Sequence, residues 1–279
     1  MPELPEVEAA RLLAQRVATG RRIVGVRCTS DPIVFESVPP RRFERALTGR
    51  RVVGIGRHGK HLWFELDKRP WPCLHFGMSG GLHAPGARRV KLASSRLREP
   101  EDAWPPRFTK LLLRFDDGGE LAVSDARRLG RIRLRRDPAA EPPISRLGFD
   151  ALLNVPPLQR FLELLSERAA PVKALLLDQT FAAGVGNWIA DEVLYQARIA
   201  PHRPARSLSS VEGRRLRSAL QRVIATAVAA RADSDRFPRS WLFHRRWGRQ
   251  RDASTARGEK IRHEVIAGRT AAWVPSVQR

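Results

Sequence analysis

The chain opens with MPELPE, in which Pro2 lies next to the acid Glu3 and a second acid, Glu6, follows three residues on. Removal of Met1, which a small second residue permits, would leave Pro2 with a free secondary amine. An α-amino group titrates at about 7.7–8.0, so a useful fraction of it is neutral and nucleophilic at cellular pH. Proline and acidic residues are also common at helix starts, so the opening by itself fits either catalysis or helix capping.

An amphipathic helix and a series of short strands follow this opening. Residues 3–18 have the helical period. The residues expected to face the core are Leu4, Val7, Leu12 and Val17. Alternating segments with turn residues between them predict strands at Arg22–Thr29, Arg51–Gly56, His61–Leu66, Lys110–Phe115, Glu120–Ser124 and Arg131–Arg135. Asp117-Gly118-Gly119 predicts a hairpin, and residues 84–107 predict a long irregular excursion. This half is expected to form a β-sandwich or barrel that the helix caps.

The second half is predicted to be helical and to form a separate domain. The proline-rich stretch 137–157 predicts a linker. Helices are predicted at Leu158–Ala169, Val172–Leu177, Asn187–Gln196 and Ser209–Ala230. Residues 231–257 are basic without a clear period, and Lys260–Ile266 with Thr270–Val274 predicts a terminal hairpin. We therefore expect an α+β protein divided into residues 1–136, the linker, residues 158–235 and residues 236–279.

The charge of the chain is strongly positive. Lys and Arg number 51 against 29 Asp and Glu, which gives a formal net charge of +22. Such a field attracts polyanions, and arginine suits two-pronged contacts with phosphate and guanine. An arginine-rich genome would also raise the arginine content, so charge alone does not establish nucleic-acid binding.

The cysteine content and the hydropathy exclude several protein classes. Cys28 and Cys73 are too few for a disulfide scaffold or a four-ligand zinc site, and we expect them to pack as small apolar residues in a reducing compartment. No apolar run reaches the roughly 18 residues of a membrane span, and the N-terminus lacks a signal pattern. We therefore expect an intracellular protein of the cytoplasm or nucleoid, with no membrane partner.

Several motifs together resemble one known family. In collinear order they are MPELPEVE at the start, Gly59-Lys60, His75–Gly80 (HFGMSG), Asp125–Arg128 (DARR), Leu176–Gln179 (LLDQ), Gly184–Asn187 (GVGN) and Gly268-Arg269-Thr270. The chain thus resembles the formamidopyrimidine-DNA glycosylase/endonuclease VIII family over essentially its whole length. The resemblance implies a bifunctional glycosylase/lyase that removes oxidised bases from double-stranded DNA. It also implies a helix–two-turn–helix module over residues 158–230.

The resemblance implies catalytic roles for five residues. Pro2 would attack C1′ of the damaged nucleotide, displace the base and leave an imine. Glu3 would be the acid that assists opening of the sugar ring, a task that a raised carboxyl pKa favours, and Glu6 would position or shuttle protons near the amine. The imine acidifies the C2′ proton, which permits β- and then δ-elimination. Lys60 would hold the phosphate beside the lesion, and Arg269 would reach it from a turn and aid δ-elimination.

A wedge is implied at Met78, which flanking glycines and Ser79 would present outward. Base chemistry in a duplex requires the nucleotide to be flipped out, and an apolar wedge fills the vacated stack. Arg127 would face the partner base, often cytosine, and Arg128 belongs to the same DNA-binding segment. Leu129 stands where most bacterial relatives have phenylalanine, and it cannot stack as a ring does, which leaves partner-base discrimination open.

Phosphate contacts are implied for three more residues. His75 would add one beside Lys60, and Lys173 would provide a point charge. Gly184-Val185-Gly186 makes a turn into a helix that starts at Asn187, where free backbone N–H groups favour phosphate. Asn187 would add its side-chain amide there.

The C-terminal region contains no cysteine, which excludes the four-cysteine zinc finger of most bacterial relatives. No cofactor is therefore expected. Lys260–Val274 resembles the zincless finger of plant and fungal members. The residues expected to hold it by packing are Ile261, Val265, Trp273 and Val274. Residues 231–248 are short where 8-oxoguanine-reading members have a longer loop. This favours formamidopyrimidines, hydantoins and abasic sites over 8-oxoguanine.

Three other functions remain open on the residues alone. Leu129 is compatible with an endonuclease VIII-like enzyme for oxidised pyrimidines. A basic DNA- or RNA-binding protein without catalysis and a structural ribonucleoprotein component both fit the charge. Neither of these would require the set of Pro2, Glu3, Lys60 and Arg269. A monomer is expected, because one lesion offers no two-fold symmetry.

Overall fold

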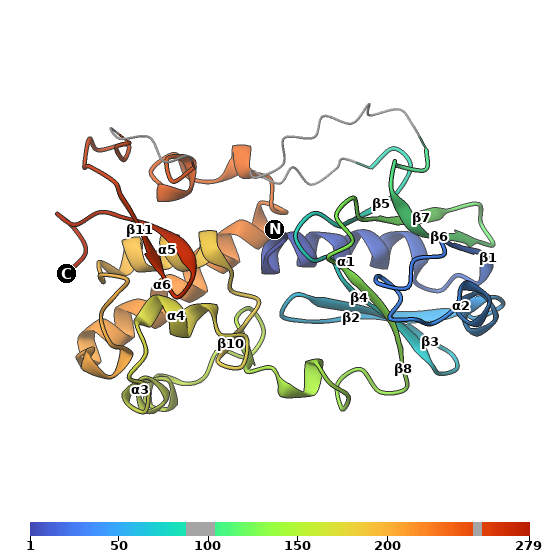
Figure 1. Cartoon of the computed structure of the whole chain (residues 1–279), viewed down its shortest axis with the longest axis horizontal. Coiled ribbons are helices and arrows are strands. Elements are labelled where there is room, and N and C mark those ends of the chain that lie inside the picture. The colour runs from blue at the N-terminus through green and yellow to red at the C-terminus, as the bar shows by residue number, and fades with distance from the viewer. Residues whose placement is uncertain (88–103, 248–252) are drawn as a thin grey trace. The chain divides into compact units, whose positions relative to one another are not determined.

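The computed structural model describes residues 1–87, 104–247 and 253–279, in two compact units, Met1–Arg146 and Leu147–Arg279 (Figure 1). Most of the predicted excursion over 84–107, and residues 248–252 of the basic segment, lie outside the described residues. The division falls within the stretch predicted as a linker, which carries the 3-10 turn η1 (Ile144–Arg146) and the short strand β9 (Phe149–Asp150). The finer predicted division of the second half stays a prediction.

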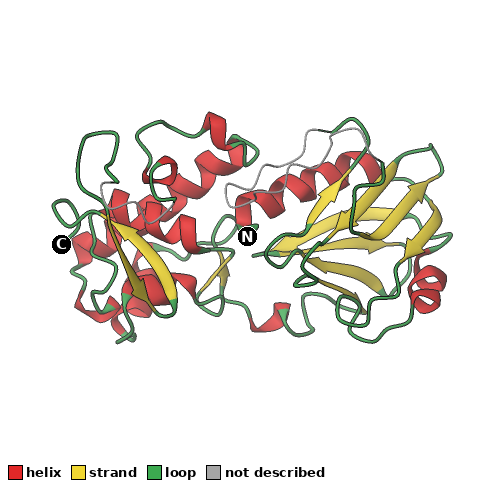
Figure 2. Ribbon diagram, turned by 45° about the horizontal axis from the view of Figure 1, so that its top comes forward, coloured by secondary structure: helices red, strands yellow, loops and turns green. Residues whose placement is uncertain are grey.

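The first unit is a β-sandwich of two four-stranded antiparallel sheets (Figure 2). One sheet contains, in spatial order, β1 (Ile23–Cys28), β6 (Thr109–Phe115), β7 (Glu120–Ser124) and β5 (Gly81–His83). The other contains β2 (Val52–His58), β3 (His61–Leu66), β4 (Trp71–His75) and β8 (Arg131–Arg135). Alternate side chains of both sheets form a single core, with Leu62 and Leu113 buried at its centre. The predicted hairpin at Asp117–Gly119 joins β6 to β7.

Helix α1 (Leu4–Ala18) covers this core with a stripe of small residues. Leu4 and Val7 are buried as predicted, and the stripe continues through Ala10 and Ala14, which bring the helix close to β2 and β5. The prediction for Leu12 is wrong: it is 38% exposed, because it lies on the helix face opposite this stripe.

Three elements of the first unit were not predicted. Helix α2 (Pro40–Leu47) packs on β1 through Phe43. Strand β4 contains a proline at its second position, and β5 has only three residues. Both free thiols belong to this unit, with Cys73 buried and Cys28 half-buried.

The second unit is built around a central buried helix. Its helices are α3 (Leu158–Ser166), α4 (Val172–Leu177), α5 (Asn187–Ala197) and α6 (Ser210–Ala229), with 3-10 turns at Ala205–Ser207 (η2), Ser234–Arg236 (η3) and Leu242–His244 (η4). Helix α5 contacts α4, α6 and the terminal hairpin of β11 (Arg262–Ile266) and β12 (Arg269–Trp273). The two-residue strand β10 (Ala182–Ala183) pairs with β9. No helix in the described ranges is long and apolar enough to cross a membrane.

Aromatic side chains organise the basic segment that showed no period. Trp188 of α5 lies 5.1 Å from the ring of Phe243 and 5.7 Å from that of Phe237, measured between ring centroids. Trp241 and Trp247 extend the same cluster. Residues 237–247 are therefore folded against α5 rather than extended as a loop.

The terminal hairpin is packed largely as predicted, with one correction. Ile261, Trp273 and Val274 are buried. Val265 is 66% exposed, because successive side chains of a strand point to opposite faces and its neighbour Ile266 takes the inward position.

This register can be tested by a matched pair of substitutions. Ile266→Ala should lower the free energy of unfolding by roughly 2 kcal/mol, since it removes a buried side chain. Val265→Ala should change it by no more than about 0.5 kcal/mol. Urea denaturation of each variant provides the measurement, and a larger loss for Val265→Ala would contradict the register.

Candidate active site

The start of α1 brings Pro2, Glu3 and Glu6 together. Glu3 is the N-cap of the helix, and the two acids form a reciprocal capping box in which Glu6 Oε2 accepts the backbone N–H of Glu3 at 2.9 Å. Pro2 and Glu3 are buried, and Glu6 is half-buried. The capping that the sequence offered as an alternative to catalysis is thus what holds both carboxyl groups at the amino end of the chain.

The electrostatics of this end suit nucleophilic chemistry. Burial lowers the pKa of the Met1 α-amino group below its usual range, and Arg127 and Lys60 act in the same direction against the two acids. Burial, followed by the charge of Glu3, raises the pKa of Glu6 to about 7. Burial at this end of the chain therefore favours the neutral form of the α-amino group, here that of Met1, and the protonated form of the Glu6 carboxyl group.

Lys60 lies almost buried in the turn between β2 and β3, beside the positive-φ residue Gly59. Arg57, three residues before Lys60, is buried. The Arg57 guanidinium donates to Glu8 Oε2 of α1 at 2.8 Å and to the Gly59 carbonyl at 3.0 Å. This buried ion pair joins α1 to the turn, and so sets the position of Lys60 relative to the acids of the helix.

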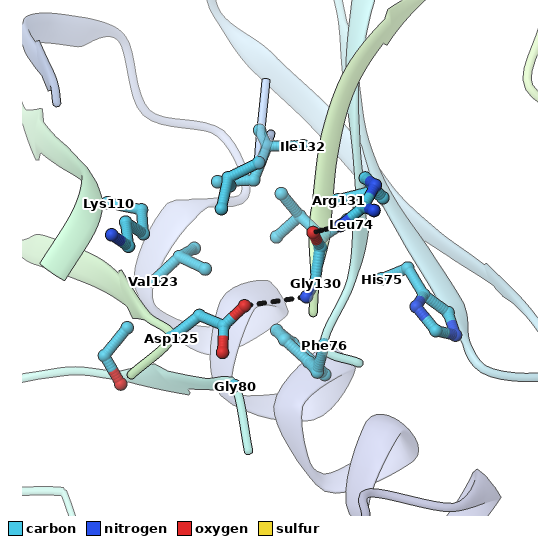
Figure 3. Close-up of a pocket in the computed structure, with 12 residues that line it drawn as sticks. Leu74, His75, Phe76, Gly80, Lys110, Val123, Asp125, Gly130, Arg131 and Ile132 are labelled. Atoms are coloured by element: carbon cyan, nitrogen blue, oxygen red, sulfur yellow. Dashed lines mark hydrogen bonds between the residues drawn. The ribbon is translucent and has the colours of Figure 1, made fainter. Parts of the chain in front are cut away.

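His75, at the end of β4, stacks on His61 with ring centroids 4.8 Å apart. Burial, with Lys60 adding to it, lowers the pKa of His75 to about 4, and burial lowers that of His61 to about 3. The ring nitrogen Nδ1 of His75 accepts the Gly77 N–H at 3.3 Å, which leaves the proton on Nε2. Figure 3 shows this ring turned away from the apolar side chains of Phe76 and Ile132. A phosphate contact from His75 would be a hydrogen bond from a neutral ring.

Two adjacent loops present the residues predicted to act as a wedge. Met78 lies between β4 and β5 and is 37% exposed, and Leu129 lies between β7 and β8 and is 45% exposed. Gly77 has φ +60°, and a Cβ there would lie 2.4 Å from the carbonyl carbon of Leu129, so the loops touch through their backbones. Arg127 is exposed beside them. Arg128 is also exposed, but its guanidinium is paired with Asp31 at 3.0 Å.

In the second unit, Asn187 begins α5 as predicted, and its amide Nδ2 donates to the Thr270 carbonyl at 2.9 Å. The predicted phosphate contact of Lys173 is wrong. Its side chain is completely buried, with Nζ 2.6 Å from Asp191 Oδ1 and 3.0 Å from the Thr270 carbonyl. An enclosed ammonium group cannot reach a phosphate.

Asp191 is the centre of a buried network that holds the hairpin against α5. Besides Lys173, its carboxylate accepts two hydrogen bonds from Arg246, the shorter at 2.6 Å, and the backbone N–H of Ala272 at 3.0 Å. Arg269, the first residue of β12, is exposed next to Thr270, whose carbonyl the same network holds. The backbone of Arg269 is thus fixed from inside the unit.

The sequence assigns no role to Arg57, Asp125, Asp191 or Arg246, because charged residues are ordinarily expected at the surface. Their buried positions show only when their partners are known. Within the described residues, no group of three or more His, Cys, Asp or Glu side chains is arranged to hold a metal ion.

Known proteins resemble the chain over its whole length. It is 40% identical over 279 residues to a formamidopyrimidine-DNA glycosylase of Arabidopsis thaliana, covering all of this chain and 71% of that protein. It is 34% identical over 290 residues to the Thermus thermophilus protein of the same name, with coverage of 100% and 98%. The solved Thermus thermophilus structure matches with a TM-score of 0.76 at 35% identity, over 99% of this chain and 98% of that one. A Lactococcus lactis structure bound to DNA with an AP site shares the fold, at 24% identity with a TM-score of 0.81 and 99% coverage of both chains.

Family models agree with these matches. The model described as Formamidopyrimidine-DNA glycosylase N-terminal domain matches residues 1–132, and the one described as Formamidopyrimidine-DNA glycosylase H2TH domain matches residues 147–238. The fold and the site therefore define a DNA-repair glycosylase. The chain belongs to the formamidopyrimidine-DNA glycosylase family. The predicted α+β fold, with its sandwich and helix–two-turn–helix domain, is confirmed.

The buried position of Lys173 leads to a testable prediction. Lys173→Ala should lower the free energy of unfolding by roughly 3–5 kcal/mol, because it leaves part of a buried carboxylate without its charged partner. Exposed Lys68→Ala should leave stability unchanged. A Lys173→Ala protein of normal stability whose DNA binding depends less steeply on salt would instead indicate a phosphate contact.

Glu6 should make stability depend on pH. Its pKa of about 7 lies above its ordinary 4.5, so the folded chain binds this proton more tightly. The resulting stabilisation is complete below pH 4.5 and is lost as the pH rises through 7. Glu6→Gln, which stays neutral, should therefore gain melting temperature relative to the parent between pH 5 and pH 8. Asp67→Asn, at an exposed site, should run parallel to the parent, and a Glu6→Gln curve that does the same would contradict the raised pKa.

Proposed function

We propose that the chain is a base-excision glycosylase with AP lyase activity, and that the Pro2 amine is its nucleophile once Met1 has been removed. The observation that carries the proposal is the capped start of α1, where Glu3 and Glu6 are held beside the amino end and Lys60 acts on its charge. A protein that only binds DNA has no need of two acids held beside a buried amino end, one of them with a raised pKa.

The reaction begins as the Pro2 nitrogen bonds to C1′ while the bond from C1′ to the base breaks, and the proton that the nitrogen loses neutralises the departing base. Glu3 protonates the sugar oxygen as the ring opens, and the imine forms between Pro2 and C1′. Glu6, which keeps its proton near pH 7, serves as the proton reservoir beside the amine. Loss of the C2′ proton then expels the 3′ phosphate by β-elimination, and a second elimination expels the 5′ phosphate.

Residues of both units contact the DNA in this proposal. Lys60 holds the phosphate next to the lesion, and His75 donates from its neutral ring. Arg269 reaches the backbone from the hairpin tip and assists the second elimination, and Asn187 contributes at the start of α5. The exposed position of Arg269 and the half-buried position of Asn187 at the start of a helix support these roles.

The wedge is formed by Met78, Arg127 and Leu129. Met78 fills the place of the flipped nucleotide, and Arg127 donates to the partner base. Arg128 holds this loop in place through its ion pair with Asp31, and it is exposed enough to contact the DNA backbone. The exposure of these side chains on two touching loops supports the assignment.

The proposed substrates are formamidopyrimidines, hydantoins and abasic sites, with 8-oxoguanine a poorer one. Residues 237–247 are folded into an aromatic cluster against α5, which supports the absence of a long lesion-covering loop from that segment. Leu129 keeps oxidised pyrimidines as the alternative. We further propose a monomer of the cytoplasm or nucleoid that acts on damaged double-stranded DNA and needs no zinc, with the hairpin held by the Asp191 network.

Borohydride trapping tests the nucleophile. The parent protein should form a covalent complex with an abasic-site duplex, because borohydride reduces the imine to a stable amine. The same protein with a short tag retained at its N-terminus, so that Pro2 is acylated, should form none. A C-terminal copy of the tag is the control and should leave trapping intact. Equal trapping by the two tagged forms would exclude Pro2.

Excision rates on matched duplexes test the substrates. Release of formamidopyrimidine should be faster than release of 8-oxoguanine by about tenfold or more, because the contacts of a lesion-covering loop are lost from the transition state for 8-oxoguanine. A preference for 8-oxoguanine would contradict the proposed substrate class, and a preference for dihydrouracil would favour the endonuclease VIII-like alternative.

A further inference from the structure

Asp125 lies where β7 ends and is only 3% exposed. Both of its carboxylate oxygens accept hydrogen bonds. Oδ1 accepts the Ser79 hydroxyl at 3.1 Å and the Arg127 backbone N–H at 3.2 Å, and Oδ2 accepts the Gly130 N–H at 2.7 Å. Figure 3 shows the carboxylate directed at Gly130. One side chain therefore binds the loop that carries Met78 and the loop that carries Arg127.

Ser79 extends this connection to the guanidinium itself. Its oxygen accepts Nε of Arg127 at 3.2 Å while its hydroxyl hydrogen points to Asp125. The hydroxyl has one hydrogen, so donation to the carboxylate leaves its lone pairs for Arg127. Asp125 thus fixes Arg127 at its backbone and, through Ser79, at its head group.

The two loops are closely packed against each other. A Cβ on Gly130 would lie 2.8 Å from the His75 carbonyl oxygen and 3.0 Å from Asp125 Oδ2. The corresponding contact of Gly77 with Leu129 is closer still. Because the two loops are closely packed at these glycines, a displacement of one loop must displace the other.

We propose that Asp125 is a positioning residue that couples the Met78 wedge to Arg127, so that selectivity for the partner base depends on it. The proposal rests on the proposed function of these two residues. Since Leu129 cannot stack on the partner, discrimination rests on where Arg127 points. A carboxylate suits the position because every group facing it is a donor, whereas asparagine would present an N–H₂ group to one of them.

The test measures binding to a duplex that holds a reduced, uncleavable abasic site opposite cytosine or opposite adenine. The parent should bind the cytosine duplex more tightly. Asp125→Asn should bring the ratio of the two affinities close to one, a loss of about tenfold, as expected when a base-reading contact is misplaced. An unchanged ratio in Asp125→Asn, or a parent protein without partner preference, would overturn the proposal.

A double-mutant comparison separates coupling from general destabilisation. In an Arg127→Ala background, Asp125→Asn should cause no further change in the ratio, because the residue through which it acts is gone. A further loss of equal size would overturn the proposal. Ser79→Ala, which leaves the buried carboxylate in place, should lower the ratio in the same direction as Asp125→Asn. If Asp125→Asn does not fold, Ser79→Ala provides the measurement instead, and an unchanged ratio in Ser79→Ala would then overturn the proposed coupling.

Asp150→Asn is the matched control. Asp150 is equally buried and accepts the backbone N–H groups of Leu152 and Leu153, both at 3.0 Å, in a turn of the second unit. The Asp150→Asn protein should be less stable but should keep the ratio of affinities for the cytosine and adenine duplexes. A ratio that falls as in Asp125→Asn would overturn the proposal. Binding requires no chemistry, so borohydride trapping of the same proteins judges the Pro2 nucleophile independently.

Discussion

A buried carboxylate is stable only when donors meet its oxygens, and the functional segments of this protein depend on that constraint. Glu8 receives Arg57 and joins the first helix to the Lys60 turn. Asp125 accepts hydrogen bonds from two loops of the sandwich. Asp191 accepts hydrogen bonds from Lys173, from Arg246 and from the backbone of the hairpin. In the proposed function Lys60, Met78, Arg127 and Arg269 would touch DNA, and their backbone segments are held by these three carboxylates. Arginine and lysine side chains provide donors to Glu8 and Asp191, so some of the cations that raise the net charge also build the interior, whereas Asp125 is met by a hydroxyl and by backbone N–H groups.

Hydrophobic periodicity was enough to predict most elements of the fold. Strands such as His61–Leu66 and Glu120–Ser124 were predicted at their observed bounds, because alternation and flanking turn residues mark them directly. Leu12 and Val265 were misplaced because a pattern of apolar residues does not say which side of the element the core lies on. Helix α2 was missed because its arginines mask the buried Phe43.

The candidate site was only partly accessible from the sequence. Family motifs indicated Pro2 and Lys60, but a motif does not say whether a charge is solvated. The family motifs therefore predict a phosphate contact for Lys173, whereas its partner Asp191 lies 18 residues further along the chain and meets it only after folding. Asp125 was visible inside a motif, yet its partner Ser79 lies 46 residues away in sequence. Long-range pairing of this kind has no local signature.

The hydrogen-bond network around Asp191 also affects how well the protein resists oxidation. A thiolate-bound metal can be lost when its sulfur ligands are oxidised, whereas a carboxylate held by ammonium and guanidinium groups offers nothing to oxidise. The protein's only cysteines lie in the other unit, and burial raises the pKa of both Cys28 and Cys73 to about 12, which keeps their thiols protonated and slow to react. The network that holds the hairpin against α5 thus contains no group that a mild oxidant would attack.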